Sequence, residues 1–189
     1  MNWDNAFTAR SPYGTVKGSP SYAGALSFMR RKYSQDLQGV DVAVAGIPLD
    51  TATTNRPGAR FGPRAVRAAS AGISWERPWP WAFDPFDSLA VVDYGDCEFD
   101  PGMPETSVPY IEKYFDRILD AGAASLMIGG DHFVTYPVLR SYAKKHGPLS
   151  LVHFDAHSDT WGEEQHRLDH GTMFYHAVKE GLVDDSRSV

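Results

Sequence analysis

Short, nearly continuous apolar runs recur along the chain, at intervals that leave room for a helix between them. Such runs are typical of strands that are buried on both faces of a sheet. The intervening segments place apolar residues at helical spacing, so strand and helix alternate. This alternation predicts an α/β fold in which a parallel sheet is covered by helices. The predicted strands are residues 42–45, 89–92, 125–128 and 149–154.

The residues at the ends of the intervening segments predict three helices. The first begins after Gly62-Pro63, because proline suits the first turn of a helix. The second covers about residues 106–121 and ends at Gly122. The third begins near residue 135 and closes on KKHGP (144–148), which puts cations in its last turn and then a Gly-Pro stop.

The chain divides into an N-terminal arm and one α/β domain. Residues 1–24 are rich in Gly, Pro, Ser and Tyr and lack periodicity, which predicts an extended arm. Residues 25–189 carry the alternating pattern and no internal linker. A chain of 189 residues suits one modest α/β domain or an incomplete larger one.

Charge and cysteine content argue against several classes of protein. The chain has 18 Lys+Arg and 24 Asp+Glu, and this acidic balance is unfavourable for binding nucleic acid or anionic membranes. No apolar run approaches the length of a membrane span, and the first residues lack the apolar region of a signal peptide. Cys97 is the single cysteine, which excludes an intrachain disulfide and favours a reducing, cytoplasmic setting.

Polar residues follow two of the predicted strands at close spacing, and we expect them to form a metal site. Asp155, His157 and Asp159 stand at positions i, i+2 and i+4, so an extended chain would point all three to one side. His132 leaves the neighbouring strand within the run GGDH and could complete the cluster. Carboxylate oxygen with imidazole nitrogen suits Mn²⁺, Fe²⁺, Co²⁺, Ni²⁺ or catalytic Zn²⁺.

Other interpretations of these residues remain open at this stage. Gly129-Gly130 before a helix could form a phosphate-binding turn, although Asp131 would repel a phosphate there. Metal-dependent phosphoesterases also place Asp and His at strand ends, but their Gly-Asn-His element is absent. We interpret His153 as a hydrogen-bonded core residue, His146 as a helix C-terminal cation and Cys97 as a small buried hydrophobe.

The sequence resembles the ureohydrolase (arginase/agmatinase) family, and most closely its bacterial agmatinase branch. Five stretches carry the resemblance, in unbroken order from about residue 22 to the last residue: GIPLDTATTNRPGARFGPRAVR (46–67), VVDYGD (91–96), GGDHFVTYPVLR (129–140), LVHFDAHSDT (151–160) and DHGTMF (169–174). The resemblance implies a three-layer α/β/α parallel sheet of the arginase type, of which this chain holds the N-terminal portion only. It also implies a binuclear Mn²⁺ centre and a homo-oligomer, because relatives are commonly trimers or hexamers.

The resemblance further implies roles for individual residues. His132 and Asp159 would bind one metal ion, His157 the other, and Asp155 would bridge them. His170 matches the family's histidine that is proposed to shuttle protons near the substrate. The alternative for His170 is a helix-start histidine bonded to backbone.

The implied reaction is hydrolysis of a small guanidino substrate. For agmatine the products would be putrescine and urea. In the loop 161–167, Glu163 or Glu164 could attract the ammonium of agmatine, whereas Arg167 could attract the carboxylate of a guanidino acid such as guanidinobutyrate. A solvated loop is the alternative for all three residues.

The resemblance also shows what the chain lacks. Family members carry two further aspartates in a later DxD motif and a downstream glutamate that grips the guanidinium, and no such segment occurs here. Metal affinity should fall when carboxylate ligands are lost. We therefore expect a truncated agmatinase that is weakly active or inactive alone; a non-catalytic remnant of the family is the alternative.

Overall fold

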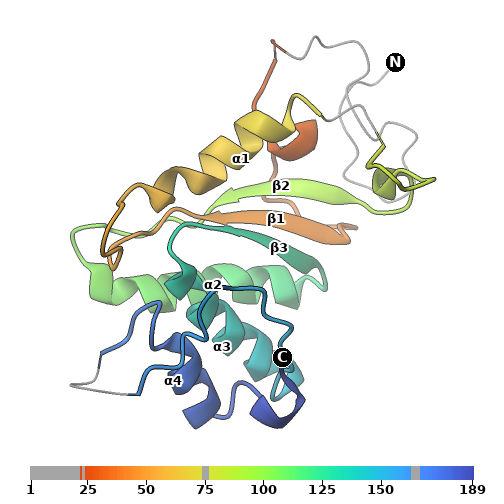
Figure 1. Cartoon of the computed structure of the whole chain (residues 1–189). Coiled ribbons are helices and arrows are strands. Elements are labelled where there is room, and N and C mark those ends of the chain that lie inside the picture. Colours follow the sequence, from red (N-terminus) through yellow and green to blue (C-terminus); the bar gives the residue numbers. More distant parts are fainter. Residues whose placement is uncertain (1–21, 23, 74–76, 163–166) are drawn as a thin grey trace.

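A three-stranded parallel sheet lies between two layers of helices in the computed structural model, which describes residues 22, 24–73, 77–162 and 167–189. Helix α1 covers one face of the sheet, and helix α2 covers the other with α3 and α4 beyond it (Figure 1). This is the predicted α/β/α architecture of the arginase type. The arm predicted for residues 1–24 falls almost wholly outside the described residues. The strands are β1 (Val42–Ile47), β2 (Val91–Asp96) and β3 (Ala124–Gly129), and the helices are α1 (Gly62–Ser70), α2 (Ser107–Asp120), α3 (Thr135–His146) and α4 (Met173–Lys179).

The strand order β2-β1-β3 explains why helices cover both faces and where a ligand can bind. The chain moves from β1 to β2 in one direction and then crosses back over β1 to reach β3. Because parallel crossovers are right-handed, these opposite moves place α1 and α2 on opposite faces. The connections leave β1 and β3 in opposite directions across the sheet. Ligands of open α/β sheets bind at such a point, beyond the carboxyl ends of the strands.

The core lies between the sheet and helix α2. Ile111, Phe115 and Ile118 lie on one face of this helix, four and three residues apart, and each is fully buried. They belong to the same apolar cluster as Ala43 and Ala45 of β1. In the described ranges, no helix is both long and apolar enough to cross a bilayer.

The fourth predicted strand, residues 149–154, is not a strand of this sheet, and its predicted burial on both faces is wrong. Val152 is 72% exposed and Phe154 is 94% exposed. The segment pairs instead with the end of the chain. The backbone N–H of Leu149 donates to Leu182 (2.8 Å), and the N–H of His153 donates to Val189 (2.7 Å). Among the described residues the sheet consists of β2, β1 and β3 alone, and residues 149–154 form no ladder with the free edge of β3.

Cys97 follows β2 and is buried, as predicted from the sequence. Burial raises the pKa of its thiol to about 12, and the nearby charges of Glu98 and Asp96 act in the same direction. Because the thiolate is the reactive form, we expect Ellman's reagent to leave Cys97 unmodified in the native chain at pH 8. One equivalent should react after unfolding in guanidinium chloride. Rapid modification of the native chain would contradict this burial.

Candidate metal centre

The loops that follow β1 and β3 meet by their backbones, at the point where the connections between strands reverse direction across the sheet. The N–H of Asp131, just after β3, donates to the carbonyl of Leu49, just after β1, over 2.7 Å. Gly130 makes this approach possible, since a Cβ there would lie 2.1 Å from the Leu49 carbonyl oxygen. The Asp131 carboxylate then accepts a hydrogen bond from the N–H of Phe133 (2.9 Å) and so caps the short 3-10 turn His132–Val134. These contacts set the position of His132.

Three of the four predicted metal ligands converge beside this turn. His132 Nδ1 lies 2.9 Å from Asp159 Oδ2 and 3.3 Å from Asp155 Oδ2. The Asp159 backbone has a φ of 52°, a left-handed conformation that aspartate tolerates better than most residues. Helix α4 fixes this position, because the N–H of Phe174 donates to the Asp159 carbonyl (3.1 Å).

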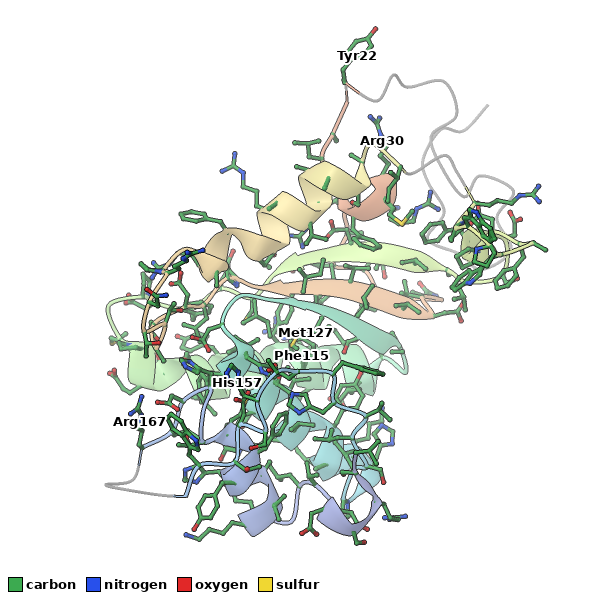
Figure 2. All side chains as sticks on the ribbon, in the orientation of Figure 1. Tyr22, Arg30, Phe115, Met127, His157 and Arg167 are labelled. Carbon is green, nitrogen blue, oxygen red and sulfur yellow. The ribbon has the colours of Figure 1, made fainter. Side chains whose placement is uncertain are left out.

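The fourth predicted ligand, His157, lies on the other side of Asp155. Its backbone N–H donates to Asp155 Oδ1 (2.9 Å), and its Nδ1 lies 3.6 Å from the same oxygen. Its side chain is 81% exposed (Figure 2 labels it). The chain bends at residues 156 and 157, so the expectation of an extended segment with all three side chains on one side is wrong. The two oxygens of Asp155 therefore face two different imidazoles.

These donors fit a divalent cation. Two ligand atoms that each lie about 2.1 Å from one ion, at a right angle, are about 3 Å apart. The separations of 2.9 and 3.3 Å around His132 match that value. The hydrogen bond from the His157 N–H lowers the pKa of Asp155, outweighs the opposing effect of desolvation, and is assisted by the charge of His132. A carboxylate that is ionised at neutral pH is ready to bind metal without losing a proton.

His170 is held by a carboxylate rather than by backbone. Its Nδ1 lies 3.2 Å from Asp131 Oδ2, and the Thr53 hydroxyl donates to the same oxygen over 3.2 Å. Asp131 is buried. Since an ionised carboxylate can only accept, this contact places the imidazole proton on Nδ1 and leaves Nε2 able to take a proton.

A cavity of about 400 Å³ opens beside these groups. Its lining includes His157, Asp159, Trp161 and His170. This volume lies within the range of small-molecule sites. Glu163 and Glu164, the predicted substrate carboxylates, lie outside the described residues.

Arg167 also lines this cavity, but a neighbouring carboxylate neutralises its charge. Its guanidinium pairs with the Asp169 carboxylate, which is buried (Figure 2 labels Arg167). Burial raises the pKa of Asp169, but the hydrogen bonds from Arg167 and the Gly171 N–H, with the Arg167 charge, lower it overall. Asp169 is therefore an anion at neutral pH and neutralises Arg167.

Asp50 fixes the loop that follows β1. Its buried carboxylate accepts hydrogen bonds from the N–H of Gly58 (2.7 Å) and of Arg60 (3.2 Å), and it pairs with the Arg60 guanidinium. Burial raises the pKa of Asp50, but these bonds and the Arg60 charge outweigh it, so the pKa lies below its ordinary value of 3.8.

The lowered pKa of Asp50 has a consequence in acid. A carboxyl group whose pKa falls on folding stabilises the fold above its unfolded pKa, and this contribution is lost as the pH drops through the folded value. We expect the thermal midpoint to fall below pH 3.8 and Asp50→Asn to weaken that dependence. Calorimetry across the acid range measures it, with exposed Asp36→Asn as the control. An unchanged acid dependence in Asp50→Asn would refute the expectation.

Sequence reasoning missed two residues of the site. His153 joins His132, Asp155 and Asp159, and the potential ligand atoms of all four lie within 4.8 Å of one another. Its position two residues before Asp155 continues the i, i+2 spacing, which was the available signal. Asp131 was considered only as an obstacle to phosphate. Its contact with His170 spans 39 positions, and no local pattern reveals it.

Comparison with known proteins identifies relatives along almost the whole chain. The model of the arginase family matches residues 40–189. The agmatinase of Chromobacterium violaceum is 56% identical over 188 residues, which is 98% of this chain and 58% of that protein. The agmatinase of Proteus mirabilis is 44% identical over 173 residues, 88% of this chain and 55% of that protein.

Solved structures agree with these relatives. The structure of a hypothetical agmatinase from Burkholderia thailandensis matches 97% of this chain and 59% of its own, with a TM-score of 0.87 and 55% identity. Proclavaminate amidino hydrolase from Streptomyces clavuligerus matches 90% and 56%, with a TM-score of 0.81 and 39% identity. The chain thus spans somewhat more than half the length of these relatives. On this sequence and structural similarity, the chain belongs to the arginase family.

Proposed function

We propose that this chain forms part of an agmatinase-type ureohydrolase, which hydrolyses agmatine to putrescine and urea at a binuclear Mn²⁺ centre. One observation carries the proposal. His132 Nδ1 lies 2.9 Å from Asp159 Oδ2 and 3.3 Å from Asp155 Oδ2, while the other oxygen of Asp155, Oδ1, faces His157. The 56% identity with an agmatinase supports the reaction type. We further propose a cytoplasmic homo-oligomer.

The residues divide between two ions. His132, Asp159 and Asp155 Oδ2 would hold one Mn²⁺, and His157 with Asp155 Oδ1 would hold part of the other. When bound, the two ions lower the pKa of a water molecule and so supply hydroxide near neutral pH. A guanidinium carbon is a poor electrophile, because its charge is spread over three nitrogens, and therefore needs a strong nucleophile.

His170, held by Asp131, would transfer the proton that the leaving amine needs. The Asp131 carboxylate holds the Nδ1–H of His170, so that Nε2 faces the reaction as a base and afterwards as an acid. The leaving amine has to gain a proton, and an imidazole side chain can take up and release one near neutral pH. Asp131 also stabilises the imidazolium form while the proton resides on it.

Agmatine is favoured over a guanidino acid by the pairing of Arg167 with Asp169. A cation that is already neutralised by a buried carboxylate offers little attraction to the carboxylate of guanidinobutyrate. Glu163 and Glu164 remain the proposed attractants for the ammonium of agmatine.

Residues beyond those of this chain would complete the site. Its relatives are longer, and the family resemblance implies two more aspartates for the metals and a glutamate for the guanidinium. We therefore expect the chain alone to release little or no urea. The alternative proposal is that this chain is a non-catalytic remnant of the family.

The experiment measures urea and putrescine after incubation with Mn²⁺ and agmatine. It compares the 189-residue chain with a hybrid in which the remaining part of the Chromobacterium violaceum agmatinase follows residue 189. We expect the hybrid to release both products in equal amounts, and Asp155→Asn in the hybrid to abolish release. A folded hybrid that binds Mn²⁺ but releases no urea, or that prefers 4-guanidinobutyrate, would contradict the agmatinase proposal.

A further inference from the structure

Trp161 presents a large aromatic side chain to the cavity beside the proposed metal centre. It lines this cavity of about 400 Å³ together with Asp159 and His170, and it is 72% exposed. Tryptophan is highly buried in most folded proteins, because its apolar surface is large. An indole that stays open on the wall of a cavity is therefore available to a ligand.

The turn that carries His170 also holds Trp161 in place. The backbone N–H of Trp161 donates to the carbonyl of Gly171 over 3.0 Å. Gly171 lies against the six-membered ring of the indole, since a Cβ at this glycine would be 3.4 Å from Trp161 Cε3. The N–H of Gly171 in turn donates to the buried carboxylate of Asp169 (2.9 Å). The indole is thus supported before any ligand binds.

The position of Trp161 along the chain suits the far end of the substrate. Trp161 follows the proposed metal ligand Asp159 by two residues, so their Cα atoms are at most about 7 Å apart. When the guanidinium carbon of agmatine lies beside the metal ligands, the butyl chain extends away from them and ends in an ammonium. The spacing along the chain puts the indole within reach of that ammonium.

The electrostatic character of the ring suits a cation. The face of an indole carries negative electrostatic potential, so it attracts an ammonium and repels a carboxylate. Arg167, which lines the same cavity, is neutralised by its pairing with Asp169 and therefore does not repel an ammonium at the ring. The indole and this ion pair both favour an amine over a carboxylate.

We propose that Trp161 binds the ammonium end of the substrate through a cation–π interaction and so selects a guanidino amine over a guanidino acid or alcohol. The inference rests on the proposed function and names the side chain that recognises the tail of the substrate. It concerns specificity, because Trp161 contacts the far end of the substrate rather than the reacting atoms.

The test titrates the 189-residue chain with two ligands of equal length and follows the N–H signals of residues 169–172 by NMR. Agmatine ends in an ammonium, whereas 4-guanidinobutan-1-ol ends in a neutral hydroxyl. We expect the unmodified chain to bind agmatine more tightly than the alcohol. In Trp161→Leu the ratio of the two dissociation constants should fall about fivefold, because the apolar contact that is lost is common to both ligands and the attraction to the charge is not.

The matched control is Trp79→Leu. Trp79 is 86% exposed and lies before the start of β2, at the end of the sheet away from the cavity. The ratio of the two dissociation constants should stay within about twofold in this variant. An unchanged ratio in Trp161→Leu, or an equal fall in Trp79→Leu, would overturn the inference.

Fluorinated tryptophans at position 161 cover the case in which Trp161→Leu does not fold. Each added fluorine draws electron density from the ring face and changes the shape of the ring little, so the attraction to a cation weakens stepwise. We expect the dissociation constant for agmatine to rise with the number of fluorines, while that for the alcohol stays within about twofold. Agmatine binding that is independent of fluorination refutes the cation–π interaction.

The hybrid enzyme separates this inference from the proposed function. In the hybrid, Trp161→Leu should raise the KM for agmatine about fivefold and leave kcat within about twofold. A hybrid that releases no urea, from a chain in which Trp161 still sets the preference for agmatine over the alcohol, contradicts the proposed function alone. A hybrid that hydrolyses agmatine with the same KM in Trp161→Leu contradicts the inference alone.

Discussion

Replacement of Arg67 with methionine is expected to lower the free energy of unfolding by about 3–5 kcal/mol, because it leaves a buried charge without its partner. Arg67 of α1 donates from Nε and Nη2 to the two oxygens of Asp93, over 2.7 and 2.9 Å, and from Nη1 to Asp96 over 2.6 Å. The Asp93 side chain is completely buried. Burial lowers the pKa of Arg67, but the bonds to both carboxylates outweigh it and raise the pKa above its ordinary value.

Urea denaturation of the purified variants measures this loss. Arg64→Met is the matched control, since Arg64 is exposed on the same helix, and we expect a change within about 0.5 kcal/mol. Asp93→Asn in the Arg67→Met background should recover part of the loss, because it removes the unpaired charge and keeps an oxygen that can accept the N–H of Phe28. A loss below about 1 kcal/mol in Arg67→Met would show that water reaches Asp93.

Gly130→Ala is expected to damage stability and metal affinity together. Its Cβ would lie 2.1 Å from the Leu49 carbonyl oxygen and 3.0 Å from the Leu49 carbonyl carbon, and backbone atoms cannot rotate away. The loop after β3 must therefore move, which stretches the bond from Asp131 to Leu49. We expect a loss of about 1–3 kcal/mol in unfolding free energy. Because His132 follows two residues later, we also expect Mn²⁺ affinity to fall by about tenfold or more.

The control for this prediction is Gly72→Ala. A Cβ at Gly72 would have its nearest neighbour at 3.5 Å, an ordinary contact. Urea denaturation and Mn²⁺ titration should therefore change little in Gly72→Ala. Gly130→Ala with full stability and full affinity would show that the two loops need not touch.

The sequence predicted the sheet and its first three helices because their determinants are local. Parallel strands need continuous apolar runs, and the runs at 42–45 and 125–128 lie within β1 and β3. The predicted burial on both faces is wrong for β3, where Leu126 is 46% exposed. Strand β2 begins at Val91, two residues after the predicted start, because Leu89 is 40% exposed and lies before the sheet. Helix α2 covers Ser107–Asp120 because its apolar positions recur at helical spacing and Gly122 ends it.

Prediction from local sequence patterns failed where contacts with distant segments of the chain decide the structure. Residues 149–154 have the composition of a buried strand, but burial requires a neighbouring strand, and a local pattern cannot supply that information. The orientation of His157 in the candidate site was missed in a similar way. The pairing of His132 with Asp159 follows from their place at neighbouring loop ends, whereas the bend at residues 156 and 157 turns His157 outward. The contact between Asp131 and His170 depends on the tertiary fold alone.

The attachment of residues 149–154 has a consequence for ligand affinity. This segment leads into Asp155 and Asp159, yet its backbone is held by hydrogen bonds to residues 182–189 rather than by a sheet. A segment held this way opens more readily than a central strand. The apparent dissociation constant then equals the intrinsic constant divided by the fraction of molecules in which the segment is in place. In the proposed metal centre, the hydrogen bonds that residues 182–189 make to this segment would therefore raise the apparent affinity for the cation, although these residues are distant in sequence from every proposed ligand.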